Sequence, residues 1–168
     1  MNRWRFLLVA TLSCICAQLA MAAGPSTRRA DEAVAVPVDL ISAALGKGTM
    51  DDEVYTIVKP RKDLLVSQID MGDVPAAAGL ASVFHFFPCP CGKTNLIGQF
   101  CVADYELNVV VDELRKADIQ IASVAPMLLG EKPRVFIIRF FARAEAAGLV
   151  EGLRNALRWT SDKPKPRK

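Results

Sequence analysis

Residues 84–101, FHFFPCPCGKTNLIGQFC, predict a β-hairpin, and this hairpin decides the fold class that we assign to the chain. Residues 82–87 and 96–102 are short and largely apolar, as β-strands are. The PCPCGKTN segment between them is rich in Pro, Gly and Asn, which favour turns. The hairpin therefore places Cys89 and Cys91 near its tip and Cys101 well along the returning strand. It also contains His85, the only histidine of the chain.

Further elements follow the hairpin in a regular order. Residues 104–117 have apolar residues at helical spacing, and Asp104 is the expected N-cap. Residues 119–128 and 134–142 form a second strand pair, and residues 145–159 form a last helix. The second strand of this pair is apolar along most of its length, which predicts burial on both faces.

The order of these elements from Phe84 is strand, strand, helix, strand, strand, helix. Hairpins that alternate with helices predict an α+β fold, with a mostly antiparallel sheet and its helices packed on one face. Before the hairpin, residues 38–46 predict a short amphipathic helix, and residues 53–60 and 64–70 predict two strands around the charged turn PRKD.

The beginning of the chain predicts export. Arg3 and Arg5 precede an apolar run over residues 6–21, and Ala20-Met21-Ala22 offers a small-x-small cleavage site. The run is short for a spanning helix of about 20 residues, so we expect cleavage near Ala22 and no membrane span in the mature protein. Lipidation at Cys14 or Cys16 fits poorly, because neither follows the usual Leu and small residues. We expect a periplasmic or secreted location.

These features divide the chain into four parts. Residues 1–22 are the expected signal peptide, 23–36 a linker, 37–158 a single α+β domain and 159–168 a disordered basic tail. Cleavage would remove two arginines and lower the net charge from +3 to +1. Four of the remaining cations lie in the tail KPKPRK. The domain itself is therefore not basic, which argues against nucleic acid as a partner.

Several segments together resemble a known family. They are PRKDL at 60–64, GLASVF at 79–84, IGQFCVADYELNVVVDEL at 97–114, LLGEKPRVF at 128–136 and LVEGLRNAL at 149–157. Their order and spacing resemble the LppY/LpqO family of bacterial exported proteins and lipoproteins, over roughly residues 35–158. The resemblance implies an envelope location and a domain of unknown function.

The chain departs from this family at the histidines. The family pattern has His-Asn-His before the LLGE segment and another His in the following strand. Here Ala125, Pro126 and Met127 occupy the first three positions and Arg139 the fourth. If those histidines form a metal or hydrolytic site in relatives, this chain has lost it.

Arg139, Met127 and Arg61 are the candidate ligand-binding residues. Arg139 interrupts the apolar segment VFIIRFF, and a charge there must reach a partner, a cavity or solvent. It is therefore the first choice for binding an anion. Met127 lies at a former histidine position, and Arg61 in PRKD fits either a turn or the rim of a ligand groove.

Cys89, Cys91 and His85 are the candidate metal ligands. Two thiolates one residue apart can bind copper or zinc, with His85 or Met127 completing the shell. Zinc sites normally have two residues between paired cysteines and a second pair, which this chain lacks. Structural or incidental cysteines, a Cys89–Cys91 disulfide and pairing between molecules stay open, because exported thiols meet an oxidising compartment.

No known enzyme signature is present, and any catalytic triad would need His85. The sequence therefore predicts an exported envelope protein, leaning away from an enzyme, that binds a small ligand or another envelope protein and holds no cofactor. One alternative is a metal-binding protein that uses the Cys-Pro-Cys hairpin and copper or zinc. The other is a hydrolase-like enzyme with an unrecognised site.

Overall fold

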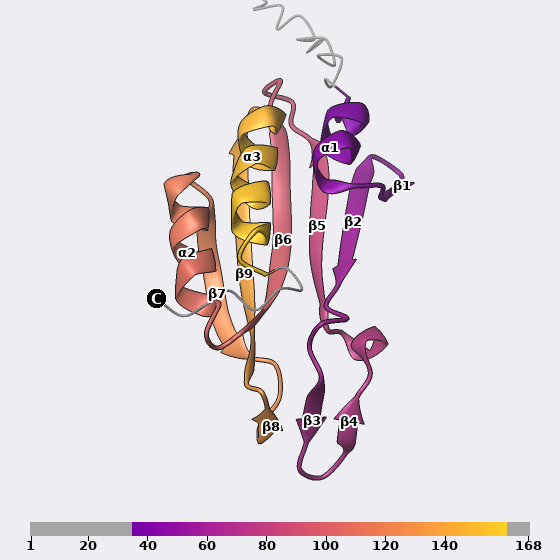
Figure 1. The fold of residues 1–168 in the computed structure, drawn as a ribbon. Coiled ribbons are helices and arrows are strands. Elements are labelled where there is room, and N and C mark those ends of the chain that lie inside the picture. The colour runs from indigo at the N-terminus through magenta and orange to yellow at the C-terminus, as the bar shows by residue number, and fades with distance from the viewer. Residues whose placement is uncertain (1–34, 161–168) are drawn as a thin grey trace, which may run out of the picture.

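The computed structural model describes residues 35–160 and confirms the predicted α+β fold (Figure 1). In chain order its elements are α1 (Val38–Leu45), β1 (Thr49–Asp51), β2 (Val54–Pro60), β3 (Val66–Gln68), β4 (Gly72–Val74), the 3-10 helix η1 (Ala76–Ala78), β5 (Ala81–Pro88), β6 (Thr94–Ala103), α2 (Leu107–Lys116), β7 (Gln120–Pro126), β8 (Glu131–Lys132), β9 (Val135–Ala144) and α3 (Ala146–Leu157).

The main sheet has six strands in the order β1-β2-β5-β6-β9-β7, and every neighbouring pair is antiparallel. The predicted hairpin is confirmed as β5 and β6, in which Phe86 lies opposite Leu96. The second predicted strand pair is confirmed as β7 and β9, with a bulge between Ile121 and Ser123. The order strand, strand, helix, strand, strand, helix holds, with the two-residue strand β8 as an addition.

All three helices pack on one face of this sheet, as predicted (Figure 1). Strand alternation directs every second side chain to this helix face. The rings of Phe84, Phe100 and Phe140 meet there, with centroids 5.1 to 6.1 Å apart. Ile41 of α1, Leu114 of α2 and others from α3 complete the buried core.

Among residues 35–160, the second face of the main sheet is covered at one end only. Strands β3, β4 and β8 form a separate three-stranded sheet, which extends beyond the lower end of the main sheet in Figure 1. A second buried cluster joins the two sheets, and it consists of Leu64, Val66, Leu80, Cys101, Ala103 and Val135. Val58, Ile97 and Phe141 lie on the same face beyond this cover and are about half exposed.

The partial cover corrects the expectation that residues 134–142 are buried on both faces. Ile138 and Phe140 are buried against the helices, whereas Arg139 and Phe141 on the other face are exposed. The small sheet reaches Val135 but not these residues. An apolar run can therefore belong to a strand with only one fully buried face.

Several predicted boundaries also change. Val36 packs in the core instead of lying in a linker, and Thr160 is buried instead of lying in a disordered tail. Helix α2 begins at Leu107 with Glu106 at the N-cap position, so Asp104 is not the N-cap. The expected signal peptide, its cleavage site, most of the linker and the last eight residues lie outside the described residues. Within 35–160, no helix is long and apolar enough to cross a membrane.

Gly98 and Gly148 provide a test of the core packing. Gly98 lies opposite Phe140, and an added Cβ would lie 2.6 Å from that ring and 2.8 Å from the carbonyl oxygen of Val83. We expect Gly98→Ala to lower the free energy of unfolding by about 2 kcal/mol or more. Gly148→Ala in α3 meets nothing within 4 Å, so it should stabilise by about 0.5 to 1 kcal/mol. Urea unfolding measures both, and equal effects would contradict this packing.

Candidate functional site

Arg61 lies at the centre of a buried network that holds two segments, residues 61–63 and 101–106, together. Its guanidinium donates two hydrogen bonds to Asp63, at 2.9 and 2.7 Å, and two to Glu106, at 2.8 and 3.0 Å. A fifth goes to the carbonyl oxygen of Cys101, at 2.8 Å. Glu106 also accepts a bond from the backbone N–H of Ala103, at 2.9 Å. We call these groups the Arg61 network.

The Arg61 network leaves no donor for a ligand. A guanidinium has five N–H groups, and the five bonds use all of them. Burial lowers the pKa of Arg61, but the hydrogen bonds and charges of Asp63 and Glu106 outweigh this and raise it above its ordinary value. Arg61 therefore stays charged and acts as a structural residue, and we do not retain it as a ligand-binding residue.

Arg139 and His85 come together on the uncovered part of the main sheet. They line one groove of about 530 Å³, together with Ile97, Gln99, Phe141 and other residues. We call the surface formed by His85, Ile97, Gln99, Arg139 and Phe141 the open face. Cross-strand register produces it, because Gln99 lies opposite Arg139 and His85 lies opposite Ile97. Two residues far apart in the sequence thus share a surface.

The strands of the open face carry positive charge and no acid, and Asp118, just before β7, lines an adjoining hollow with Phe141 and Arg143. Strands β5, β6, β9 and β7 contain no Asp or Glu, whereas Arg139 and Arg143 are both exposed on β9. The side chain of Arg139 has no hydrogen bond or ion pair with any residue between 35 and 160. His85 accepts or donates a hydrogen bond with the hydroxyl of Thr56, at 2.9 Å from its Nδ1. An acidic group would thus find a free guanidinium on this surface.

Met127, the third predicted ligand-binding residue, lies elsewhere. It packs against the second buried cluster, and its methyl group is close to Gly79. It does not line the groove that contains Arg139 and His85. Ala125 is also outside that groove. Of the positions that carry histidines in the family pattern, Arg139 therefore lines the groove with His85, whereas Ala125 and Met127 lie outside it.

The two tip cysteines are joined to each other. Cys89 and Cys91 form a disulfide, and Cys101 is free and buried, as its distance from the tip predicts. Sulfurs in a disulfide are not the thiolates that bind copper or zinc. Within the described part of the chain, no three His, Cys, Asp or Glu side chains are grouped to hold a metal ion.

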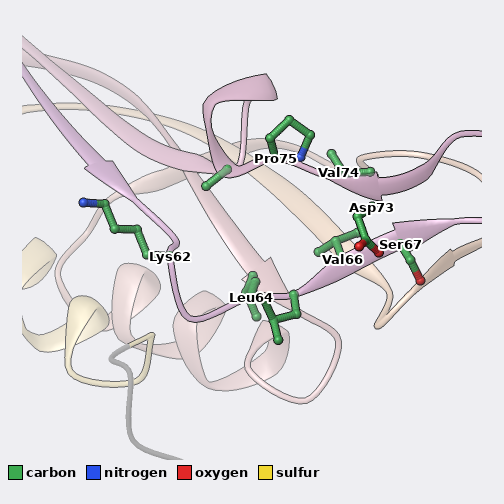
Figure 2. A pocket seen from close by; sticks show the side chains of 9 residues that line it. Lys62, Leu64, Val66, Ser67, Asp73, Val74 and Pro75 are labelled. Atoms are coloured by element: carbon green, nitrogen blue, oxygen red, sulfur yellow. The ribbon is translucent and has the colours of Figure 1, made fainter.

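A larger hollow lies beside the small sheet (Figure 2). It has a volume of about 770 Å³, and its polar residues are Lys62, Ser67 and Asp73. Lys62 points away from Asp73 in Figure 2, so no polar groups converge on a ligand. Sequence reasoning predicted β3 within residues 64–70 but missed β4 and β8, because strands of two or three residues leave almost no periodic signal. Large exposed apolar side chains flank the small sheet, namely Leu65, Ile69, Met71 and Leu129.

Substitution of Arg61 tests the network. Arg61→Met would leave the Asp63 and Glu106 carboxylates without their buried cation, so we expect a loss of about 3 kcal/mol or more in the free energy of unfolding. Lys62→Met is the matched control, because the adjacent side chain is exposed and should have little effect. Chemical denaturation measures both. A loss for Arg61→Met as small as that of the control would show that the network contributes nothing.

Cys101 predicts a pH dependence of stability. Burial raises the pKa of its thiol from 9.0 to about 11. Between these values the unfolded chain loses the proton and the folded protein keeps it, so the free energy of unfolding falls as pH rises. Urea unfolding at pH 8 and pH 11 measures the decrease in the free energy of unfolding. This decrease should be smaller in Cys101→Ala than in the wild-type protein, by on the order of 2 kcal/mol. Identical decreases in both proteins would contradict the raised pKa.

Comparison with known proteins places the chain in a family. No curated protein and no solved structure is significantly similar to it. The profile of a family described as Domain of Unknown Function (DUF1259) matches residues 39–159, which include every helix and strand from β1 to α3 and most of α1. Because this match covers well over half of the sequence, the chain belongs to the DUF1259 family.

Proposed function

We propose that this protein is a binding protein of the bacterial envelope and that its open face, a non-catalytic surface, binds an acidic surface of another envelope protein. The observation that carries the proposal is Arg139, an exposed guanidinium without a described partner, on strands that contain no acidic residue. A carboxylate on the partner supplies the missing charge through paired N–H···O bonds.

The form of the open face favours a protein over a small molecule. Ile97 is 52% exposed and Phe141 is 45% exposed, so a small ligand here would stay largely in water. Small-molecule sites usually bury 70 to 90% or more of the ligand surface. An aromatic and an aliphatic side chain around an arginine are instead typical of protein interfaces, where aromatic residues and Arg contribute much of the affinity.

The envelope location rests on the sequence. The apolar run after Arg3 and Arg5, the small residues around Ala22 and the resemblance to the LppY/LpqO family all support export. The proposed envelope location and the proposed binding by the open face both concern the mature chain, in which the domain meets other envelope proteins. Release into the medium instead of the periplasm would change the set of partners but not the chemistry of the open face.

The chemistry of His85, the Arg61 network and Cys101 favours binding over catalysis at these places. His85 is paired with Thr56 through Nδ1, and no described residue hydrogen-bonds its other ring nitrogen to orient it as a base. The Arg61 network is closed to ligands, and Cys101 is buried with a raised pKa, which opposes thiolate formation. These groups therefore do not supply an activated nucleophile and its base.

Site-specific photo-crosslinking tests the proposal. A photoreactive amino acid replaces Ile97 in the full chain, expressed in the cells that make the protein. We expect a discrete crosslinked adduct that falls at least about tenfold with Arg139→Glu, because charge reversal at a central arginine costs 1.4 kcal/mol or more. Arg154→Glu on α3 is the matched control, since this exposed arginine lies on the helix layer, and the adduct should persist.

Two results would contradict the proposal. One is the absence of an adduct above background at position 97. The same photoreactive amino acid at an exposed helix position defines this background. The other is an adduct that responds equally to Arg139→Glu and Arg154→Glu, which would show that Arg139 has no special role. Thermal unfolding of each variant confirms that it is folded before the adducts are compared.

A further inference from the structure

The Cys89–Cys91 disulfide lies in a turn that joins β5 and β6. We call residues 89–93 the CPC turn. Only Pro90 separates the two cysteines, so the disulfide closes a small ring and links no distant parts of the chain. A disulfide that closes such a short loop contributes little to stability in the chain-entropy view, because it removes little freedom from the unfolded chain. Its presence at the tip therefore calls for a role other than bracing the fold.

The two cysteines differ in their surroundings. Cys91 is exposed, whereas Cys89 is 4% exposed. The backbone N–H of Cys91 points to the Sγ atom of Cys89, at 3.2 Å. A hydrogen bond to a thiolate favours the charged form, so this bond stabilises Cys89 as the leaving group against the opposing effect of its burial. An incoming thiolate meets Cys91 first, and the departing charge then rests on Cys89.

Other hydrogen bonds hold the CPC turn in place. The N–H of Cys89 donates to the carbonyl oxygen of Lys93 at 3.0 Å, and the N–H of Gly92 donates to that of Cys89, also at 3.0 Å. The side chain of Asn95 bonds the carbonyl oxygen of Pro88, at 3.0 Å. Gly92 has φ of 79°, which a glycine adopts without strain. The turn can thus open its disulfide and keep its shape.

The charges near the tip also suit a thiolate. No Asp or Glu occurs between Val74 and Asp104, whereas Lys93 belongs to the turn itself. Lys93 is thus the charged residue nearest to both cysteines in sequence and favours a thiolate, while Glu145, which follows Ala144 opposite Thr94, is an acid that the register brings to the same end of the sheet. Cys101 cannot take part, because it is buried near the other end of β6, opposite Ile137 of β9.

We propose that the CPC turn is a thiol–disulfide exchange site that oxidises dithiols of exported proteins. A substrate thiolate attacks the Sγ atom of Cys91, the Cys89–Cys91 bond breaks, and its electron pair leaves on Cys89. The second substrate thiolate then attacks the substrate sulfur of this mixed disulfide and releases Cys91 as a thiolate. The substrate gains one disulfide, and the CPC turn gains two electrons and the two protons that the substrate thiols lose.

Equilibration with glutathione is the first test. The purified full chain is incubated with reduced and oxidised glutathione, quenched with acid, alkylated and mapped by peptide mass spectrometry, which separates Cys14 and Cys16 from the tip. We expect Cys89 and Cys91 to be reduced together and reversibly while thermal unfolding stays cooperative and Cys101 stays unlabelled. A disulfide that is reduced only when the protein unfolds would overturn the proposal.

Single variants test the order of attack. Cys89→Ser should form a mixed disulfide with glutathione at Cys91 at least tenfold faster than Cys91→Ser forms one at Cys89, because Cys91 is exposed. Equal rates would overturn the proposed roles.

A model peptide tests the activity itself. Wild-type protein should oxidise a peptide with two cysteines, forming one peptide disulfide for each CPC turn reduced. The double variant Cys89→Ser, Cys91→Ser should not, and equal oxidation by it would refute the activity. The Arg139→Glu variant should oxidise the peptide as the wild-type protein does. The test of the CPC turn is thus independent of the function proposed for the open face.

Discussion

The rest of the structure depends on the buried guanidinium of Arg61. Three of its five hydrogen bonds connect the segment after β2 to Cys101 and Glu106 at the corner between β6 and α2, 40 and 45 residues further along the chain, and the other two go to Asp63. Buried charge is tolerated only with such complete pairing. By fixing this corner, the Arg61 network holds the segment that leads into the small sheet against one end of the second face. The other end of that face stays uncovered, and this is the open face.

Two arginines that look similar in the sequence thus have opposite roles. Arg61 is buried and fully bonded, so it stabilises the fold, whereas Arg139 is exposed on a strand without acidic neighbours. The difference comes from what surrounds each one in space. Two carboxylates and a carbonyl oxygen meet Arg61, while Arg139 faces neutral side chains such as Gln99 and Phe141. Membership of the DUF1259 family supplies no activity, so the argument for binding rests on this contrast.

Much of the fold was predictable, because the sequence signals for most elements lie within the elements themselves. The turn residues around Pro90 and the apolar spacing of α2 and α3 encode their own elements, so the order of strands and helices follows from the sequence. The pairing of Arg61 with Glu106 depends on contacts distant in sequence, and an acid near the start of a predicted helix is common without such a partner. Likewise, apolar strand β9 gave no sign that one of its faces is half open. The disulfide at the tip was one of several open alternatives.

NMR of the arginine side chains tests the division between the two arginines most directly. Bonded guanidinium protons in a buried site exchange slowly with water and give separate signals, whereas exposed ones exchange fast. The account predicts resolved, slowly exchanging Nε and Nη proton signals for Arg61 and rapid exchange for Arg139 in the same sample. Exchange at Arg61 as fast as at Arg139 would contradict it, because Arg61 would then have free donors and the Arg61 network would not close the corner of the fold.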